Sequence, residues 1–224
     1  MSFILTSKVG SNKDQFPDIL SLYVPKPAKI LDMTWGKGVF WKKVEIVTMI
    51  VDPPWKDDDG YQVWPNDLNS EKGAFHYDFG NLPEDWTEVF DAVVLDPPYL
   101  LTGGFKTLKD SIDRGYENRE RASRGIKGVV GVVQMYAKGA LEAHRVLKPK
   151  GIFIVKTMDQ VESGKQQWLS IRLITLFDLL GFDSVDWFVI TMPGMPTMRH
   201  DKQDHARRNH SYFLVFRKRG KWGR

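Results

Sequence analysis

The most constraining feature of this chain is an apolar run that ends in two successive prolines. Residues 90–95 predict a buried strand, which is followed directly by Asp96, Pro97, Pro98 and Tyr99. Each proline fixes φ and lacks a backbone N–H, so the carbonyl groups at this point form a rigid pair of hydrogen-bond acceptors. The preceding carboxylate and the following aromatic ring complete a clamp for a flat molecule with an amino group. The acceptors bind the amine hydrogens, and the ring stacks on the π-face.

A second motif lies upstream, where the short apolar segment 29–31 leads into a Gly-x-Gly turn. Asp32 ends the predicted strand, and the two glycines are Gly36 and Gly38. Glycine permits positive φ and close approach of the backbone, so a cofactor can lie on such a turn where a side chain would block it. In open α/β sheets, ligands bind at the carboxyl ends of the strands, and both motifs lie at such ends.

Two further acidic residues follow predicted strands. Asp52 ends the apolar run 44–51 and lies twenty positions after Asp32, a spacing that suits a hydrogen bond to a ribose hydroxyl. The run 73–77 is expected to be a third strand that ends at Asp78 and Phe79. For Asp52 and Asp78 the alternative is an ordinary turn or helix-cap carboxylate.

These motifs resemble those of class I S-adenosylmethionine-dependent methyltransferases that modify exocyclic amino groups of nucleic-acid bases. Asp-Pro-Pro-Tyr is similar to their catalytic motif, and the glycine turn is similar to their cofactor motif, Asp-x-Phe-x-Gly-x-Gly. Trp35 beside the first glycine departs from that pattern, and no Phe occupies the usual place. The cofactor motif comes first in the chain, as in the gamma group. Asp at the first motif position resembles the adenine-N6 enzymes.

The resemblance implies a doubly wound, mainly parallel, seven-stranded α/β sheet of the Rossmann-like type with a C-terminal antiparallel strand pair. It implies S-adenosyl-L-methionine as cofactor, with Asp52 on its ribose and Asp78 on its adenine. The implied cofactor-binding residues are Phe16, Asp32, Met33, Thr34, Trp35, Gly36, Gly38, Asp52, Asp78 and Phe79.

In the implied reaction, Asp96 and the Pro97 carbonyl bind the amine, Pro98 completes the motif, and Tyr99 stacks on a flipped base. The expected activity is methylation of adenine N6 in DNA. The same chemistry on RNA (adenine N6 or guanine N2) or on cytosine N4 stays open, as does a non-catalytic nucleic-acid-binding subunit. A second copy, Asp52-Pro-Pro-Trp55, resembles the signature of RNA adenine methyltransferases, but their permuted motif order is not found here.

The chain contains no cysteine, and this excludes two kinds of base chemistry. Methylation at C5 of a pyrimidine needs a thiolate nucleophile. Zinc-dependent base deamination loses its usual cysteine ligands. Transfer to an exocyclic amine needs neither, because the nitrogen attacks the sulfonium methyl directly and the enzyme supplies position and hydrogen bonds.

The C-terminal half completes the methyltransferase outline. Helical spacing predicts a helix over 129–147 and another over 167–180 that Gly181 closes. A strand is expected at 152–155, and a terminal strand pair at 186–191 and 212–216. We therefore expect a single methyltransferase domain over residues 1–224.

Three segments outside the expected sheet and helices are rich in basic residues. They are substrate-facing loops at 100–128 and 192–210 and a basic tail at 217–224. The first holds seven basic residues against four acidic ones, and the formal net charge of the chain is +4, which suits phosphate contact. A solvated, charged surface is the alternative. The predicted nucleic-acid-binding residues are Lys106, Arg114, Arg119, Arg121, Arg124, Arg199, Arg207 and Arg208.

Partners and location follow from the same features. Nucleic acid is the expected partner, DNA rather than RNA, and a homodimer or a separate specificity subunit stays open. No apolar run is long enough for a membrane helix and the start lacks a secretion signal, so a cytoplasmic location is expected. His200, His205 and His210 match no common ligand spacing, and no metal site is predicted.

Overall fold

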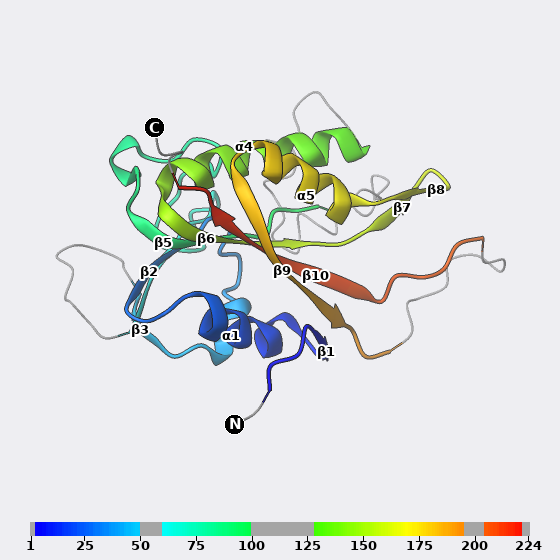
Figure 1. The fold of residues 1–224 in the computed structure, drawn as a ribbon, viewed down its shortest axis with the longest axis horizontal. Coiled ribbons are helices and arrows are strands. Elements are labelled where there is room, and N and C mark those ends of the chain that lie inside the picture. Colours follow the sequence, from blue (N-terminus) through cyan, green and yellow to red (C-terminus); the bar gives the residue numbers. More distant parts are fainter. Residues whose placement is uncertain (1–2, 50–59, 100–127, 195–203, 221–224) are drawn as a thin grey trace.

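The computed structural model describes residues 3–49, 60–99, 128–194 and 204–220 (Figure 1). The strands of the main sheet are β1 (Ser7–Val9), β2 (Ala28–Asp32), β3 (Ile46–Met49), β4 (Tyr61–Pro65), β5 (Phe90–Leu95), β6 (Leu147–Thr157), β9 (Phe182–Thr191) and β10 (His210–Lys218). A separate hairpin consists of β7 (Gln160–Glu162) and β8 (Lys165–Gln167). The helices are α1 (Asn12–Tyr23), α4 (Gly128–Val146) and α5 (Leu169–Leu179), with short 3-10 helices η1 (Phe40–Lys43) and η2 (Glu84–Trp86).

In the described residues the main sheet has eight strands, in the order β1-β9-β10-β6-β5-β2-β4-β3. Neighbouring strands from β3 to β6 are parallel. β10 is antiparallel to both β6 and β9. The predicted mainly parallel α/β sheet with antiparallel C-terminal strands is therefore confirmed. The short β1, which pairs in parallel with β9, is an eighth strand that the sequence did not predict.

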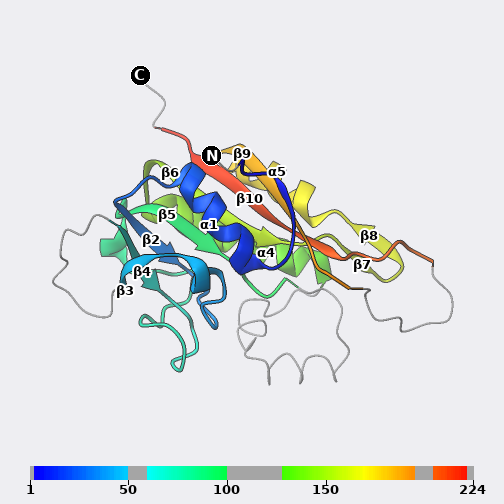
Figure 2. The ribbon, with the colours of Figure 1, turned by 90° about the horizontal axis from the view of Figure 1, so that it is seen from below.

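Helices cover both faces of this sheet, α4 and α5 on one and α1 with η1 on the other (Figures 1 and 2). Successive side chains of a strand point to opposite faces, and β5 follows this rule. Val93 and Leu95 pack into the core beneath α4 and α5. Ala92 and Val94 pack into the core beneath α1. Both faces of the central strands are apolar, which explains why these strands appear in the sequence as continuous hydrophobic runs.

The helices of the C-terminal half agree closely with the sequence. The predicted helix 129–147 is α4, and the predicted helix 167–180 contains α5. Gly181 has φ +91°, a left-handed conformation that suits the residue after a helix. The predicted strands 152–155, 186–191 and 212–216 all lie within longer strands, β6, β9 and β10. No helix in the described ranges is both long and apolar enough to cross a membrane.

The third predicted strand, 73–77, is wrong. These residues form no strand, apart from an isolated bridge between Asn66 and Phe75. Gly73 (φ +72°) turns the chain across the end of β4, where the N–H groups of Ala74 and Phe75 both donate to the Pro65 carbonyl. The strand next to β2 is β4 instead, whose five residues are all buried. The run 44–51 contributes β3, which lies at the edge of the sheet beyond β4.

Candidate active site

Three adjacent parallel strands end in acidic residues at one edge of the sheet. β2 ends at Asp32, β4 is followed by Asn66 and Asp67, and β5 is followed by Asp96. Since β2 pairs in parallel with both β4 and β5, these ends lie side by side. This is the edge at which ligands bind in open α/β sheets.

Asp32 organises the glycine turn from a buried position. Its Oδ1 accepts from the Thr34 N–H at 3.0 Å, and its Oδ2 accepts from Trp41 Nε1 at 2.7 Å. Burial raises the pKa of Asp32 to about 7, although the two donors lower it and the nearby Asp96 and Asp67 carboxylates raise it slightly further. Both oxygens thus fix the shape of the turn.

The turn itself has the backbone shape that the sequence predicted. Gly36 and Gly38 have φ of +57° and +59°. A Cβ at Gly36 would meet nothing closer than the Thr34 carbonyl oxygen at 3.9 Å, so the space beside the turn is open. A Cβ at Gly38 would lie 2.7 Å from the ring of Trp35, which stacks on Trp41 with ring centroids 6.0 Å apart. The ring of Trp35, a residue that departs from the resembled motif, therefore packs between Gly38 and Trp41.

Asp67, rather than Asp52, follows the strand beside β2. The Gly36 N–H donates to Asp67 Oδ2 at 2.8 Å, so this carboxylate lies directly beside the glycine turn. The sequence predicts Asp52 at the ribose from its spacing of twenty positions after Asp32. The place beside β2 belongs to β4, and Asp52 itself lies outside the described residues. The same holds for the rest of the second Asp-Pro-Pro-aromatic motif.

Asn66 connects the turn to the segment that carries Asp78. Its amide nitrogen donates to the carbonyl oxygens of Met33 and Tyr77, and its Oδ1 accepts from the Tyr77 N–H. Asp78 follows on an exposed turn, where its Oδ1 accepts from the Gly80 N–H at 2.8 Å. Phe79 is buried in the core beneath α4. Asp78 therefore lies on a turn, not at a strand end.

The Asp-Pro-Pro-Tyr motif is attached to the glycine turn by one hydrogen bond. The backbone N–H of Asp96 donates to Thr34 Oγ1 at 2.7 Å. At the other end of the motif, the Tyr99 carbonyl accepts from Gln160 Nε2 of β7 at 2.7 Å. Pro97 is buried, whereas Pro98 and Tyr99 are partly exposed. The predicted catalytic and cofactor motifs thus share one site, and the β7–β8 hairpin supports it.

Burial raises the pKa of the Asp96 carboxyl above its ordinary value, and the positive charge of Lys156 lowers it in part. Lys156 lies near the end of β6 and is 1% exposed. Its own pKa is lowered by burial, with the Asp96 charge acting in the opposite sense. The site therefore contains a partly buried acid and a buried base that act on each other.

Besides Phe79, two predicted cofactor residues lie in the core. Phe16 of α1 has no exposed surface, and its ring packs against Phe40, Trp41 and Phe213. A cofactor contact by Phe16 does not fit this placement. Met33 is 1% exposed, so its side chain packs with the core beneath α4, and its backbone carbonyl binds Asn66.

Of the predicted nucleic-acid-binding residues, the structure describes two, Arg207 and Arg208. The Arg208 guanidinium lies 5.5 Å from the ring centroid of the half-exposed Trp168 and donates to Gln166 Oε1 at 2.6 Å. The others, Lys106, Arg114, Arg119, Arg121, Arg124 and Arg199, lie outside the described residues.

Of the predicted basic tail, Arg217 and Lys218 belong to β10, and Arg219 pairs with Asp178 and Asp183.

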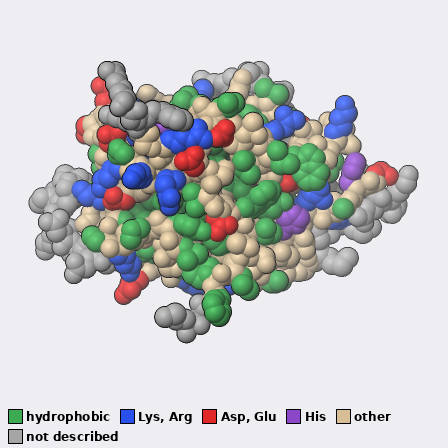
Figure 3. Space-filling view, viewed as in Figure 1, with side chains coloured by type: hydrophobic (Ala, Val, Ile, Leu, Met, Phe, Trp, Pro, Cys, Tyr) green, Lys and Arg blue, Asp and Glu red, His purple; other side chains and the backbone are tan. Residues whose placement is uncertain are grey.

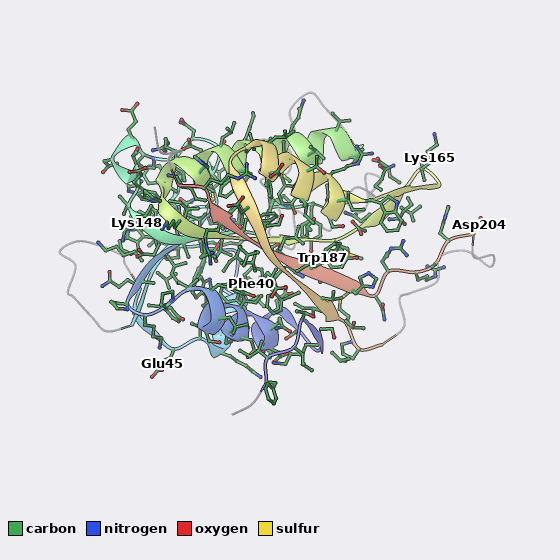
Figure 4. All side chains as sticks on the ribbon, viewed as in Figure 1. Phe40, Glu45, Lys148, Lys165, Trp187 and Asp204 are labelled. Atoms are coloured by element: carbon green, nitrogen blue, oxygen red, sulfur yellow. The ribbon has the colours of Figure 1, made fainter. Side chains whose placement is uncertain are left out.

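Figure 3 shows hydrophobic side chains gathered over β9 and β10, with histidines toward the end of the molecule at which β10 begins. Figure 4 locates Trp187 over these strands, Lys165 at the tip of the β7–β8 hairpin, and Asp204 beyond them at the same end. Within the described ranges, no group of three or more His, Cys, Asp or Glu side chains is arranged to bind a metal ion.

Comparison with known proteins identifies the fold but no family. No family model matches the sequence, and no curated protein matches it. The 4+2 cyclase SpnF aligns with a TM-score of 0.53 and 14% identity over 92% of this chain and 82% of its own. TrmN from Thermus thermophilus aligns with a TM-score of 0.50 and 14% identity over 92% of this chain and 48% of its own.

A third match is TTHA0409, also from Thermus thermophilus and named as a candidate DNA modification methylase, with a TM-score of 0.40 and 18% identity over 65% of this chain and 52% of that one. The chain thus spans about half the length of TTHA0409. Together with the strand order, the likenesses to SpnF and TrmN show a Rossmann-like α/β fold. At these identities they show nothing finer.

Sequence reasoning missed Asp67, Gln160 and Lys156. For Asp67 the signal was the Asn-Asp pair after Pro65, hidden because the preceding strand contains Gln62 and ends in proline. For Lys156 the signal was a lysine in an otherwise apolar run, Ile-Phe-Ile-Val-Lys-Thr, one strand away from the Asp-Pro-Pro-Tyr motif. Gln160 had no signal, because the short β7–β8 hairpin that carries it was not predicted.

Proposed function

We propose that the protein transfers a methyl group from S-adenosylmethionine to an exocyclic amino group of a nucleic-acid base, with adenine N6 in DNA as the favoured target. The observation that carries this proposal is the hydrogen bond between the Asp96 N–H and Thr34 Oγ1, at 2.7 Å. It joins the first residue of the amine-binding motif to the glycine turn. An amine bound at Asp96 and a cofactor bound on that turn would be neighbours, as direct methyl transfer requires.

The residues around the turn fit S-adenosylmethionine. The open space at Gly36 accepts a ligand against the backbone. Asp67 is suited to the ribose hydroxyls, since each of its oxygens accepts one backbone N–H, from Gly36 or Asn69, and retains a second lone pair. Asp78 is exposed, follows the Tyr77 that Asn66 binds, and is suited to the adenine amino group. When bound, S-adenosylmethionine supplies an electrophilic methyl group on a sulfonium.

The chain's own groups would bind and orient the amine. The Asp96 carboxylate and the Pro97 carbonyl accept its hydrogens, which directs the nitrogen lone pair toward the methyl group. Positive charge develops on that nitrogen during transfer, so an ionised Asp96 stabilises the transition state more than the ground state. Tyr99, whose carbonyl is held by Gln160, offers its ring for stacking on the base.

The surface next to this site supports a nucleic-acid substrate. Trp168 is 49% exposed and lies under the Arg208 guanidinium, an aromatic and cationic combination that suits a stacked base with its phosphate. The basic residues predicted at 106–124 directly follow Tyr99 in the sequence. We include in this proposal that these basic residues contact phosphates. We also include that a homodimer or a separate specificity partner acts with the chain on its substrate.

Identification of the methylated nucleoside tests the proposal. Purified protein is incubated with methyl-labelled S-adenosylmethionine and total DNA or total RNA, and the digested nucleosides are separated by mass. We expect labelled N6-methyldeoxyadenosine. Label in RNA, on cytosine N4 or on guanine N2 would support methyl transfer to an exocyclic amine but would exclude adenine N6 in DNA as the target. No transfer to either nucleic acid, together with intact nucleic-acid binding, would support the non-catalytic subunit.

A further inference from the structure

The most unusual group near the site is a buried lysine that the proposed chemistry does not use. Lys156 is 1% exposed, although it lies on β6 next to the strand that ends at Asp96. Lysine is almost never fully buried unless it is paired. Its Nζ donates to Ser211 Oγ of β10 at 2.5 Å and lies 4.8 Å from the ring centroid of Phe213. The ammonium is therefore held in a fixed place by β10.

Lys156 and Asp96 lie on the same face of the sheet. Leu95 of β5 pairs with Val155 of β6, so the next residue of each strand is also adjacent. Ile154, two residues before Lys156, and Val94, two residues before Asp96, both pack into the core beneath α1. Because strand side chains alternate, Lys156 and Asp96 follow them on that face.

The other charged groups around the pair are acids or lie outside the pair's reach. Asp32 ends β2 and Asp67 follows β4, and both are negative when ionised. Tyr136 of α4 donates to the Lys156 carbonyl. Burial raises the pKa of the Tyr136 hydroxyl, and Tyr99 and Asp96 raise it further. On α1, the acids pair with lysines at the surface, Asp18 with Lys8 and Asp14 with Lys43. In the part of the chain that the structure describes, Lys156 is the cation whose charge acts on Asp96.

We propose that Lys156 is a positioning residue whose buried ammonium keeps the Asp96 carboxylate ionised for its contact with the substrate amine. The role of this charge in binding the substrate amine rests on the proposed function, whereas the effect of the Lys156 charge on the ionisation of Asp96 does not. A protonated Asp96 would lose the negative charge that stabilises the developing cation on the amine. No hydrogen bond or ion pair joins Lys156 to Asp96 among the described residues, so Lys156 supplies charge while Ser211 holds its Nζ.

The direction of the effect follows from the two charges. Burial favours the neutral acid and raises the pKa of Asp96, and the ammonium of Lys156 acts against this. Removal of the ammonium should therefore raise the pKa of Asp96 further. By reciprocity, removal of the Asp96 charge should lower the pKa of Lys156, since that charge now raises it.

The test is a direct titration of both groups in the full chain, without substrate. Aspartate carboxyl carbons are labelled with ¹³C and followed by NMR against pH, and Asp96→Asn identifies the Asp96 signal. In Lys156→Met, which keeps the length of the side chain, we expect the Asp96 midpoint to rise by about one pH unit or more. Lys156→Arg keeps the charge and should keep the midpoint near the wild-type value. In Asp96→Asn, the titration of Lys156, followed at its labelled Cε, should move to lower pH.

Lys218 is the matched control. It is also a buried lysine on β10, but it lies at the opposite edge of the sheet, where its Nζ donates to the Leu147 carbonyl at 2.6 Å. Lys218→Met should leave the Asp96 midpoint unchanged. If Lys156→Met does not fold, Lys156→Gln, which retains a donor for Ser211, serves in its place.

An Asp96 midpoint that is the same in Lys156→Met or Lys156→Gln as in the wild type overturns the inference. The outcome is separate from that of the proposed function. If methyl transfer occurs, the low-pH limb of kcat should move upward with the Asp96 midpoint, which a merely structural role for Lys156 would not cause. If the midpoint moves but no nucleic acid is methylated, the proposed function fails while the electrostatic contact stands.

Discussion

The hydrogen bond between Thr34 and Asp96 should be measurable as both stability and activity. Thr34→Val keeps the shape of the side chain but removes Oγ1, the acceptor that the Asp96 N–H contacts at 2.7 Å. Because this N–H is partly buried at the end of a strand, valine leaves it without its acceptor. The Thr34 N–H still donates to Asp32, so the backbone of the turn is otherwise unchanged.

The expected size follows from the cost of an unsatisfied buried donor, about 1–3 kcal/mol of unfolding free energy. In a domain of this size, each kcal/mol shifts the melting temperature by about 2–4 °C. Thr34→Val should therefore melt about 2–12 °C below the wild type. Turnover should fall as well, since the variant loses the bond that joins Asp96 to the glycine turn.

Urea unfolding followed by circular dichroism gives the free energy, and Thr34→Ser is the matched control because serine keeps the Oγ acceptor. We expect Thr34→Ser to retain most of the stability and turnover. If Thr34→Val and Thr34→Ser are equally stable and equally active, the hydrogen bond contributes nothing and the reasoning is refuted.

Three further predictions follow from the same geometry. Gly38→Ala should lose about 1–3 kcal/mol more unfolding free energy than Gly36→Ala in urea titrations. Both residues have positive φ, but only the new Cβ at position 38 would meet an aromatic ring, that of Trp35, at 2.7 Å. Equal losses would contradict this prediction. Gln160→Leu should lower turnover but not the affinity for S-adenosylhomocysteine by calorimetry, because it releases the carbonyl of Tyr99 in the amine-binding motif. An equal loss of both would assign Gln160 to cofactor binding. Burial raises the pKa of Asp32 from 3.8 to about 7. Protonation of Asp32 therefore stabilises the fold fully below about pH 4, and this stabilisation is lost as the pH rises through about 7. Asp32→Asn should flatten the fall in unfolding free energy between about pH 4 and about pH 7, and an unchanged slope would show that Asp32 does not titrate there.

The parts of the fold that the sequence predicted are those with strong local signals. The apolar run before Asp96 and the helical spacing in 129–147 both correspond to real elements, β5 and α4. The glycines at 36 and 38 have the positive φ that their motif suggested. Each of these signals arises within a short stretch of chain, so no knowledge of the tertiary structure was needed.

The errors concern the order of strands in space, which a single sequence does not encode locally. The run 44–51 is the next predicted strand in the chain after β2, and the role of Asp52 was predicted from its spacing alone. The chain instead places β3 at the sheet edge and returns through β4, so Asp67 occupies the adjacent strand end. Lys156 was missed for a related reason, because its importance depends on Asp96 in the neighbouring strand and on Ser211 more than fifty residues later.

The most direct test of the central claim compares two aspartates at opposite ends of β5 in the methyl-transfer assay at saturating cofactor. Asp96 follows the carboxyl end of β5, whereas Asp91 lies near its start, where it pairs with Lys148 at 2.7 Å. We predict that Asp96→Ala lowers kcat by about 100- to 1000-fold and largely retains S-adenosylhomocysteine binding, while Asp91→Ala retains wild-type turnover if it folds. Wild-type turnover in Asp96→Ala would contradict the account, and its loss in Asp52→Ala instead would transfer the catalytic role to the first Asp-Pro-Pro motif.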